Sequence, residues 1–293
     1  IVFRAGVNED LAATAIWGTQ QINLSEGAKH DGVFSMWYGK GPGVDRSGDV
    51  FKHGNLAGSA PHGGVLLLAG DDHTCKSSTT AHQSEFAFVD AMIPVLNPAG
   101  VQEFLDLGLY GWAMSRFSGC WVAFKTVAET VDSSASVHVD PHRVKIVTPE
   151  GFEMPEGGLN IRWPDEFLPQ EDRLHRYKIQ AALAFARANR LDKITLDSPK
   201  RRLGIVTTGK SYLDVRQALD DLGISESQAS DIGISIYKVA MVWPLEPEGM
   251  REFAEGLEEI LVVEEKRSLI EGQLKEQLYD LPDNKRPNVL GKH

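Results

Sequence analysis

Val7-Asn8-Glu9-Asp10 opens the stretch that decides the fold, and an apolar, alanine-rich run follows it, Leu11-Ala12-Ala13-Thr14-Ala15-Ile16-Trp17. Asn8 stands where a helix N-cap would stand, so we expect a helix with Glu9 in its first turn. The preceding Ile1-Val2-Phe3 indicates the end of a buried strand. Glu9 would then lie just beyond a strand's carboxyl end, where ligands bind in open α/β sheets. Two interpretations stay open: a solvated acid that complements the helix dipole, or a catalytic carboxylate that faces a cofactor.

Length, charge and cysteine content limit the class of protein. The chain has 293 residues, which is enough for two domains, and no run of about 20 apolar residues that would span a membrane. Its net charge of -11 argues against nucleic acid, which needs a basic surface. Cys75 and Cys120 form no CxxC pattern, so we expect a reducing, cytoplasmic compartment and no iron–sulfur cluster on this chain.

Apolar runs alternate with helical segments over the first 130 residues. The run 63–70 is continuous and bounded by glycines, which is typical of a strand buried on both faces. The other expected strands are 33–38, 93–96 and 121–127, and the expected helices are 85–91 and 98–114, the second opened by Pro98. Strands alternating with helices predict a parallel sheet with right-handed crossovers.

Two polar or glycine-rich stretches follow the first strands. Gly39-Lys40-Gly41-Pro42-Gly43 is expected to break the first strand and to lead into a loop through Asp49. Lys40 and Arg46 beside it are interpreted as solvated, with contact to an anionic substrate as the alternative. The polar loop 71–80 follows the second strand and would face the same edge of the sheet as Glu9.

The remainder of the chain predicts a connector and a second domain. Residues 131–200 are expected to be an irregular connector with one helix, 172–190. Strands at 203–209, 232–238 and 259–265 alternate with helices at 210–222, from Pro247 and at 269–278, without a GxGxxG motif. Residues 287–293 show no clear terminal structure. The predicted class is α/β, with two doubly wound parallel-sheet domains, 1–130 and 201–293, joined by the connector.

Five short motifs occur in an order that resembles a known family. They are Asn8-Glu9-Asp10-Leu11-Ala12, Lys52-His53-Gly54-Asn55, Gly63 to Asp72, Ile93-Pro94-Val95-Leu96 and Val262-Val263-Glu264-Glu265-Lys266-Arg267. Together they resemble indolepyruvate:ferredoxin oxidoreductase, the arylpyruvate branch of the 2-oxoacid:ferredoxin oxidoreductases, over nearly all of the chain. The amino-acid sequence around residues 39–49 is most similar to that of the long fused bacterial form. We therefore expect a segment of a longer, fused polypeptide.

The resemblance implies roles for the domains and for particular residues. Residues 1–130 resemble a thiamine pyrimidine-binding domain that is N-terminally incomplete, and 201–293 resemble a transketolase C-terminal-like domain. The family's thiamine carboxylate falls on Glu9. The loop that approaches the cofactor falls on 71–78, and we expect cofactor contacts from His53, Asn55, Asp72 and His73. The family's diphosphate-binding domain, with its magnesium signature, and its cluster cysteines have no counterpart here, so Mg²⁺ and [4Fe-4S] clusters are expected on other parts of the enzyme.

The chemistry of thiamine diphosphate explains why a carboxylate is required. A carboxyl group bonded to a ring nitrogen of the aminopyrimidine favours the imino tautomer, whose exocyclic nitrogen can remove the thiazolium proton. Positioned acid–base help of this kind is worth roughly 10²–10⁴ in rate. With the resemblance, the catalytic interpretation of Glu9 is preferred, and a desolvated carboxyl would suit the shared proton.

Other polar groups have a structural alternative. His53, His62, His73 and His82 match no zinc spacing, so no metal site is predicted, and pocket-lining and solvated roles both stay open. Asp71 and Asp72 are expected to form hydrogen bonds or to structure their loop. Thr207-Thr208-Gly209-Lys210 ends a strand and opens a helix, so it could bind a phosphate of coenzyme A, although a structural role is favoured. Glu264 to Arg267 is interpreted as an interface or a solvated charge cluster.

The expected activity is oxidative decarboxylation of an arylpyruvate such as indolepyruvate to an aryl-acetyl-CoA, with ferredoxin as acceptor. The expected partners are a thiamine diphosphate-binding domain or subunit, ferredoxin and further copies in a homo-dimer or larger assembly. One alternative is another thiamine enzyme, such as a transketolase or the β subunit of a 2-oxoacid dehydrogenase. The other is a coenzyme A- or nucleotide-binding module that has lost catalysis.

Overall fold

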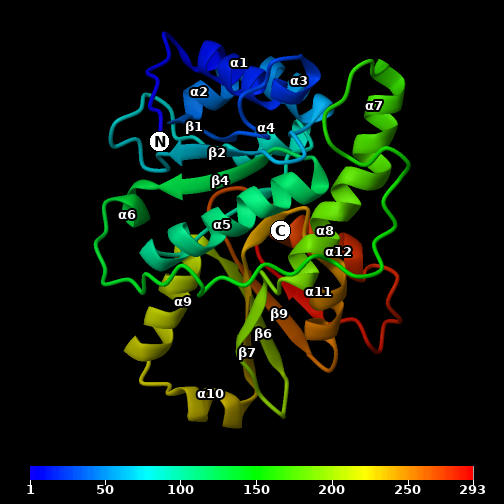
Figure 1. The fold of residues 1–293 in the computed structure, drawn as a ribbon. Coiled ribbons are helices and arrows are strands. Elements are labelled where there is room, and N and C mark those ends of the chain that lie inside the picture. The colour runs from blue at the N-terminus through cyan, green and yellow to red at the C-terminus, as the bar shows by residue number, and fades with distance from the viewer. Residues whose placement is uncertain (293) are drawn as a thin grey trace. The chain divides into compact units, whose positions relative to one another are not determined.

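The computed structural model describes residues 1–292 and divides into two compact units. The first unit contains residues 1–96 and 101–189, and the second contains 97–100 and the chain from Arg190 onward. Each unit is built on a mainly parallel sheet with helices, which confirms the predicted α/β class (Figure 1). The expected connector, residues 131–200, is divided between the two units: residues 131–189 pack with the first unit, and residues 190–200 pack with the second.

The sheet of the first unit has the strand order β1-β2-β4-β3 and is parallel throughout. Its strands are β1 (Phe34–Lys40), β2 (Gly64–Asp71), β3 (Val95–Leu96) and β4 (Val122–Val127). In the register of the pairs, Phe34 lies opposite Gly64 and Leu66 opposite Val122. The carboxyl ends of β1 and β2 therefore lie side by side, as the alternation of strands and helices predicted.

Helices cover both faces of this sheet (Figure 1). One face carries α1 (Glu9–Gln20), α2 (Gly41–Arg46) and α3 (Gly48–Ala57), and the other carries α5 (Val101–Ser118). Shorter segments are η1 (Ile22–Leu24), α4 (Glu85–Asp90) and α6 (Ala128–Val131). The core under α3 is aromatic: the ring of Phe51 lies 5.1 Å from that of Trp37 and 6.4 Å from that of Trp121.

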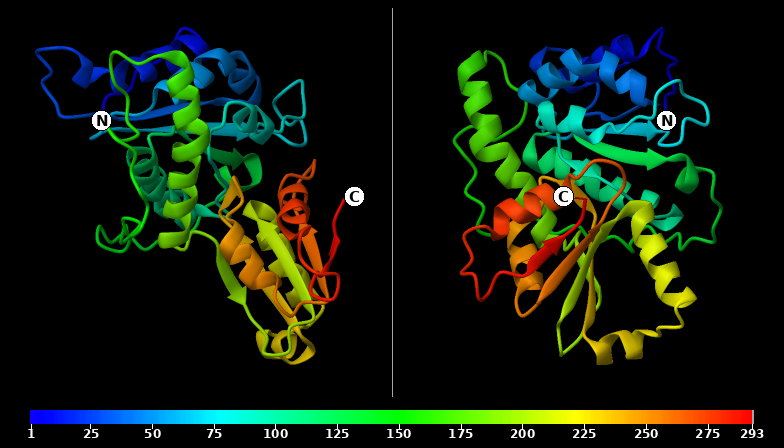
Figure 2. Two further views of the ribbon diagram at one scale, coloured as in Figure 1. Left: turned by 90° about the vertical axis from the view of Figure 1, so that its right-hand side faces the viewer. Right: turned by 180° about the vertical axis from the view of Figure 1, so that it is seen from behind.

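A long helical segment explains why 131–189 belong to the first unit. It runs through α7 (Phe167–Arg173), the π-helical η2 (Leu174–Lys178) and α8 (Ile179–Ala188), and α8 packs against α5 (Figure 2). The side chain of Lys178 is buried, and its Nζ donates to the carbonyl oxygens of Asn55 at 3.0 Å and Leu56 at 2.9 Å. Burial lowers the pKa of Lys178 to about 8. These bonds tie η2 to the end of α3.

The second unit has the strand order β10-β9-β6-β7-β5. Its strands are β5 (Lys193–Leu196), β6 (Leu203–Thr208), β7 (Ile234–Val239), β9 (Glu259–Val263) and β10 (Asn288–Leu290), and β8 (Met241–Trp243) follows β7 in the chain. Its helices are α9 (Gly209–Asp221), α10 (Glu226–Ile232), α11 (Pro247–Ala254) and α12 (Ile270–Leu278). All pairs within that order are parallel except β5 with β7, which is antiparallel.

Several sequence expectations are wrong in detail. Residues 1–3 form no strand, and their side chains are exposed, because no strand among residues 1–292 pairs with them. The expected loop through Asp49 is mostly helical, since Pro42 fits the first turn of α2. The helix expected from Pro98 begins at Val101. The sequence missed the edge strands β5 and β10; β10 gains its backbone partners from β9.

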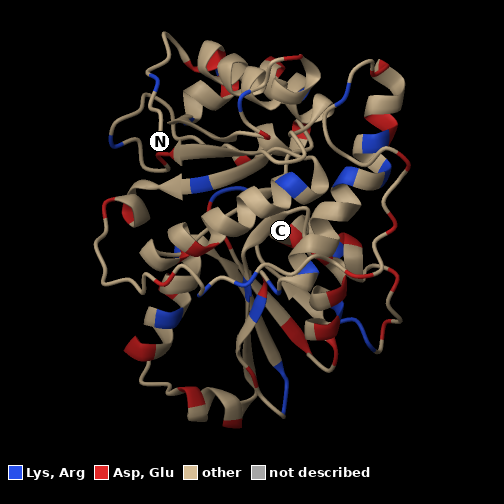
Figure 3. Cartoon of the chain, in the orientation of Figure 1, with Lys and Arg blue, Asp and Glu red and all other residues tan. Residues whose placement is uncertain are grey.

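Two further features of the structure are the distribution of its charged residues and the character of its helices. Lys and Arg are interspersed with Asp and Glu along the elements and do not gather on one of them (Figure 3). Among residues 1–292, none of the helices has both the length and the apolar character needed to cross a membrane.

Candidate functional site

Glu9 lies in the first turn of α1, as the sequence predicted. The Asn8 side chain caps this helix by accepting a hydrogen bond from the amide of Leu11 at 3.0 Å. The buried indole of Trp37 on β1 donates from Nε1 to the carbonyl oxygen of Glu9 at 3.0 Å. The start of α1 is therefore capped by one local hydrogen bond and fixed to the sheet by a second one from β1.

The side chain of Glu9 packs over α2, the helix that follows β1. A Cβ atom at Gly43 would lie 2.6 Å from Cγ of Glu9, so the space for this side chain depends on a glycine. Arg46 pairs with the neighbouring Asp10 at 3.2 Å and not with Glu9. Within the described part of the chain, nothing donates a hydrogen bond to the half-buried Glu9 carboxylate. It is a positioned carboxylate whose oxygens remain available to a ligand.

Asp72 closes the loop that follows β2. Its carboxylate accepts hydrogen bonds from the amides of Lys76 at 2.9 Å, Ser77 at 2.6 Å and Ser78 at 3.0 Å. These bonds, led by that from Ser77, hold the pKa of Asp72 below its ordinary value of 3.8. Both carboxylate oxygens are thus used to fold the loop. The structure gives Asp72 the loop-structuring role that the sequence left open beside a cofactor contact.

Asp71 fixes the other end of the same loop. It accepts from the amide of Ser84 at 2.8 Å and from its hydroxyl at 2.5 Å. Burial raises the pKa of Asp71, against the lowering effect of the Ser84 hydrogen bonds and of Lys125. Beside it, Glu85 and Lys125 form a buried ion pair at 2.5 Å. The loop is therefore held at its beginning and at its end by adjacent aspartates.

One histidine of this loop, His82, lies against α2, and a second, His73, contacts its carbonyl oxygen. Nδ1 of His73 is 2.7 Å from the carbonyl oxygen of His82, and Nε2 of His82 is 3.3 Å from Oδ2 of Asp45. A Cβ at Gly41 would lie 2.2 Å from Cγ of His82, so the ring packs directly on the first residue of α2. Since α2 also carries Gly43, the loop with His73 and the Glu9 side chain contact the same short helix. The sequence predicted no separate role for His82 among the four histidines of this region.

The two cations expected near this edge have partners. Nζ of Lys40 donates to the carbonyl oxygen of Ser77 at 2.9 Å and to its hydroxyl at 3.0 Å. Arg46 pairs with Asp10, as described above. Lys40 thus ties the loop after β2 to the end of β1, which adds to the clamp formed by the aspartates.

The remaining predicted site residues lie elsewhere. Asn55 is fully buried, and its amide group is used by the backbone: Nδ2 donates to Ala91 and Met92 at 2.9 and 2.8 Å, and Oδ1 accepts from Trp121 at 2.9 Å. His53 on α3 is 3.7 Å from Asp49 and its ring stacks 6.0 Å from that of Trp17. Trp17 stands eight residues after Glu9, or about 12 Å along α1. The structure therefore places His53 and Asn55 away from Glu9, and it brings the loop of His73 to α2 through His82.

In the second unit, the predicted charge cluster after β9 has a structural role. The Glu264 carboxylate accepts hydrogen bonds from the amides of Leu269, Ile270 and Glu271 at 2.9–3.1 Å. It thus caps the start of α12. At the end of β6, the hydroxyl of Thr208 donates to Val239 at 2.8 Å.

Comparison with known sequences finds similar proteins for both units. Residues 192–293 match the model of the indolepyruvate ferredoxin oxidoreductase middle domain. The chain is 23% identical over 280 residues to the indolepyruvate oxidoreductase subunit IorA of Methanothermobacter marburgensis, an alignment of 94% of this chain and 41% of the relative. It is 27% identical over 227 residues to IorA of Pyrococcus abyssi, covering 75% of this chain and 33% of the relative. The chain thus spans about two fifths of the length of the first of these relatives.

Comparison with solved structures concerns the fold. The chain resembles 2-oxoglutarate:ferredoxin oxidoreductase from Magnetococcus marinus with a TM-score of 0.64 and 14% identity, over 98% of this chain and 53% of that one. It resembles a split-gene transketolase, an inactive β4 tetramer, with a TM-score of 0.56 and 12% identity, over 99% and 74%. The resemblance drawn from the ordered motifs is confirmed: residues 192–293 match the indolepyruvate ferredoxin oxidoreductase middle domain, and 94% of the chain is similar to part of an IorA subunit.

Proposed function

We propose that this chain supplies the aminopyrimidine side of a thiamine diphosphate site in an enzyme that oxidatively decarboxylates 2-oxo acids. The single observation that carries the proposal is the Glu9 carboxylate: Asn8 and Trp37 hold the backbone at the start of α1, and the carboxylate has no donor within residues 1–292. The preferred substrates are arylpyruvates such as indolepyruvate, with coenzyme A as acyl acceptor and ferredoxin as electron acceptor. Indolepyruvate is supported by the names of the IorA relatives, ferredoxin by the description of the middle-domain family, and coenzyme A by the ligands of the solved 2-oxoglutarate:ferredoxin oxidoreductase.

The residues present fit one end of the cofactor. The Glu9 carboxyl has free oxygens to share a proton with a ring nitrogen, and the bare Cα of Gly43 leaves its side chain the room to do so. When bound, thiamine diphosphate supplies an electron sink for decarboxylation. The part of this chain is to hold the proton at the Glu9 carboxyl, while Trp37 fixes the backbone that carries this side chain.

The loop 72–84 has a second role in the proposal. Asp71, Asp72 and Lys40 fix its shape, and the loop contacts the helix that packs on Glu9 through His82. We assign it to the wall of the substrate site. Asp72 acts there through the loop amides and not by direct contact, and Asn55 and His53 support α3.

The groups that this chain lacks are assigned to other parts of the enzyme. The groups that would hold Mg²⁺, the diphosphate and the [4Fe-4S] clusters are expected on a further domain or subunit, and the assembly is expected to be a cytoplasmic dimer or larger oligomer. The second unit is assigned a structural role, because Glu264 and Thr208 are used in capping and in a backbone contact.

Turnover tests the proposal directly. The complete enzyme is given indolepyruvate, coenzyme A and ferredoxin, with and without thiamine diphosphate. We expect ferredoxin reduction that depends on the cofactor. If the cofactor binds and no ferredoxin is reduced, the redox assignment is wrong, and a transketolase-like reaction, tested with sugar phosphates, takes its place.

A further inference from the structure

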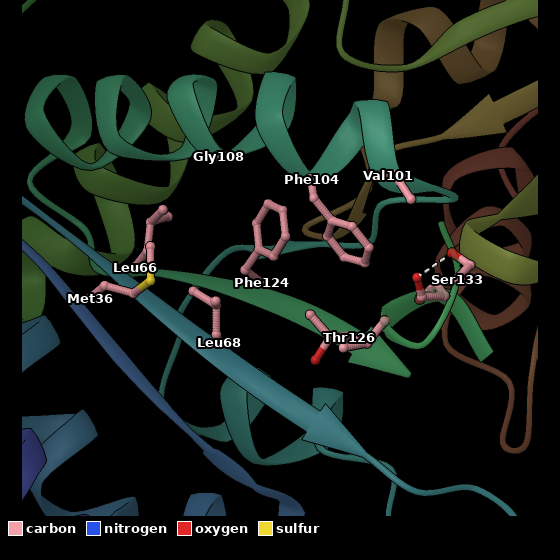
Figure 4. A pocket seen from close by; sticks show the side chains of 11 residues that line it. Met36, Leu66, Leu68, Val101, Phe104, Gly108, Phe124, Thr126 and Ser133 are labelled. Carbon is pink, nitrogen blue, oxygen red and sulfur yellow. Dashed lines mark hydrogen bonds between the residues drawn. The ribbon is translucent and has the colours of Figure 1, made fainter. Parts of the chain in front are cut away.

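A cavity of about 290 Å³ lies between α5 and the sheet of the first unit (Figure 4). Side chains of β1, β2 and β4 form its floor, and α5 forms its roof. The lining residues are Met36, Leu66, Leu68, Val101, Phe104, Gly108, Phe124, Thr126, Thr130, Val131 and Ser133. None of these side chains carries a charge, so the cavity favours a neutral ligand.

The cavity is separate from the Glu9 site. Met36 points into it, whereas the next residue of β1, Trp37, bonds to the carbonyl of Glu9. Successive side chains of a strand point to opposite faces of a sheet. The cavity therefore lies on the other face of the sheet from the Glu9 carboxylate.

The walls are suited to a flat aromatic ring. The rings of Phe104 and Phe124 have their centroids 6.0 Å apart and are tilted by 42°, and both point into the cavity from opposite walls (Figure 4). An apolar cavity of about 150 Å³ is enough to hold benzene. The space here is about 290 Å³, so it can accept a bicyclic ring.

One end of the cavity is polar, and it offers acceptors. The hydroxyl of Thr126 donates to Ala69 at 3.0 Å, that of Thr130 to Val127 at 3.1 Å, and that of Ser133 to Thr130 at 2.6 Å. Each hydroxyl hydrogen is thereby used, while a hydroxyl oxygen keeps lone pairs. A ligand at this end would be favoured if it brought an N–H donor.

We propose that this cavity is a binding site for a small neutral aromatic ring, up to a bicyclic ring with one N–H group. The ring packs beside the contacting pair Phe104 and Phe124, and its N–H points toward the hydroxyls of Thr126, Thr130 and Ser133. This site goes beyond the proposed function, because it lies on a different face from Glu9 and its binding needs neither the cofactor nor turnover.

The test uses indole as the probe and calorimetry to measure its affinity for the whole protein. Gly108 lines the cavity and a Cβ there would meet no atom within 4 Å, so Gly108→Leu has room for its Cβ and fills part of the cavity with its side chain. Gly272→Leu is the matched control, because Gly272 is also helical and equally open but lies on α12. We expect saturable binding by the wild type and by the control, and affinity lowered by roughly tenfold or more in Gly108→Leu.

Two other results would overturn the site. Equal affinity in Gly108→Leu would place indole elsewhere. Absence of indole binding in the wild type, together with a smaller oligomer in Gly108→Leu by sedimentation, would make this cavity a protein interface. Benzofuran, which has the shape of indole without the N–H, is expected to bind several-fold more weakly; equal binding would remove the hydroxyls from the proposal.

Discussion

Glu9 in the first unit and Glu264 in the second both stand beside the start of a helix, and their surroundings differ. Glu264 accepts hydrogen bonds from three amides at the start of α12. At α1 the capping position is taken by Asn8, and the Glu9 carboxylate is left with no donor among residues 1–292. An acid near a helix start is structural when it supplies the cap itself. It is available to a ligand when another residue has already done so.

The largest effect that follows from this contrast concerns Glu9. Glu9→Gln is expected to lower turnover by about 10²–10⁴, because the amide keeps the shape but cannot share a proton. The free energy of unfolding should change by no more than about 0.5 kcal/mol, since no internal hydrogen bond is lost. Steady-state kinetics and chemical denaturation measure the two quantities. Unchanged turnover would show that Glu9 is not catalytic and only complements the dipole of α1.

The second prediction tests the position of the same carboxylate. Gly43→Ala would place a Cβ 2.6 Å from Cγ of Glu9, so the side chain must move. Turnover is expected to fall by roughly 10- to 100-fold, because small misplacement of a reacting group is costly. Gly48→Ala on the adjacent helix is the control, since a Cβ there meets nothing within 4 Å. Equal activity of the two variants would show that Gly43 does not position Glu9.

The third prediction concerns the capping acid. Glu264→Ala removes the acceptor of three amides at α12, so we expect a loss of about 1.5–3 kcal/mol in the free energy of unfolding. Chemical denaturation measures the loss, and Glu9→Gln serves as the comparison. If both variants were equally stable, the distinction between a capping acid and a free acid would fail.

The smallest effect is local and depends on pH. Hydrogen bonds from the loop amides lower the pKa of Asp72 below 3.8 in the folded protein. Its contribution is therefore complete above the unfolded value of about 3.8 and is lost as the pH falls through the lower folded pKa. Hydrogen exchange at the amides of Lys76, Ser77 and Ser78 should stay protected until that range is reached. In Asp72→Asn these amides should exchange faster at neutral pH; protection equal to wild type would contradict the clamp.

The sequence predicted the architecture well where apolar periodicity was long. The continuous run of β2 and the Asn8 cap of α1 are both found in the structure. It failed where a partner decides the outcome. Residues 1–3 are apolar but have no paired strand, whereas Asn288–Leu290 is a strand because β9 lies beside it.

The same limit applies to the candidate site. Position in the sequence identified Glu9, but it could not distinguish Asn55, whose amide is used by three backbone groups, from a ligand-binding residue. The role of Gly43 depends on a contact between α2 and α1, which no sequence pattern signals. Hydrogen-bond partners from distant segments decide both cases.

In the proposed function, the Glu9 carboxyl holds a proton against the aminopyrimidine of thiamine diphosphate, which would favour loss of the thiazolium proton. The most direct measurement is the rate of hydrogen–deuterium exchange at that carbon in the complete enzyme, for wild type and Glu9→Gln, under conditions where both bind the cofactor. The account predicts exchange slowed by about 10²–10⁴ in the variant. Exchange at the wild-type rate, with the cofactor bound, would contradict it.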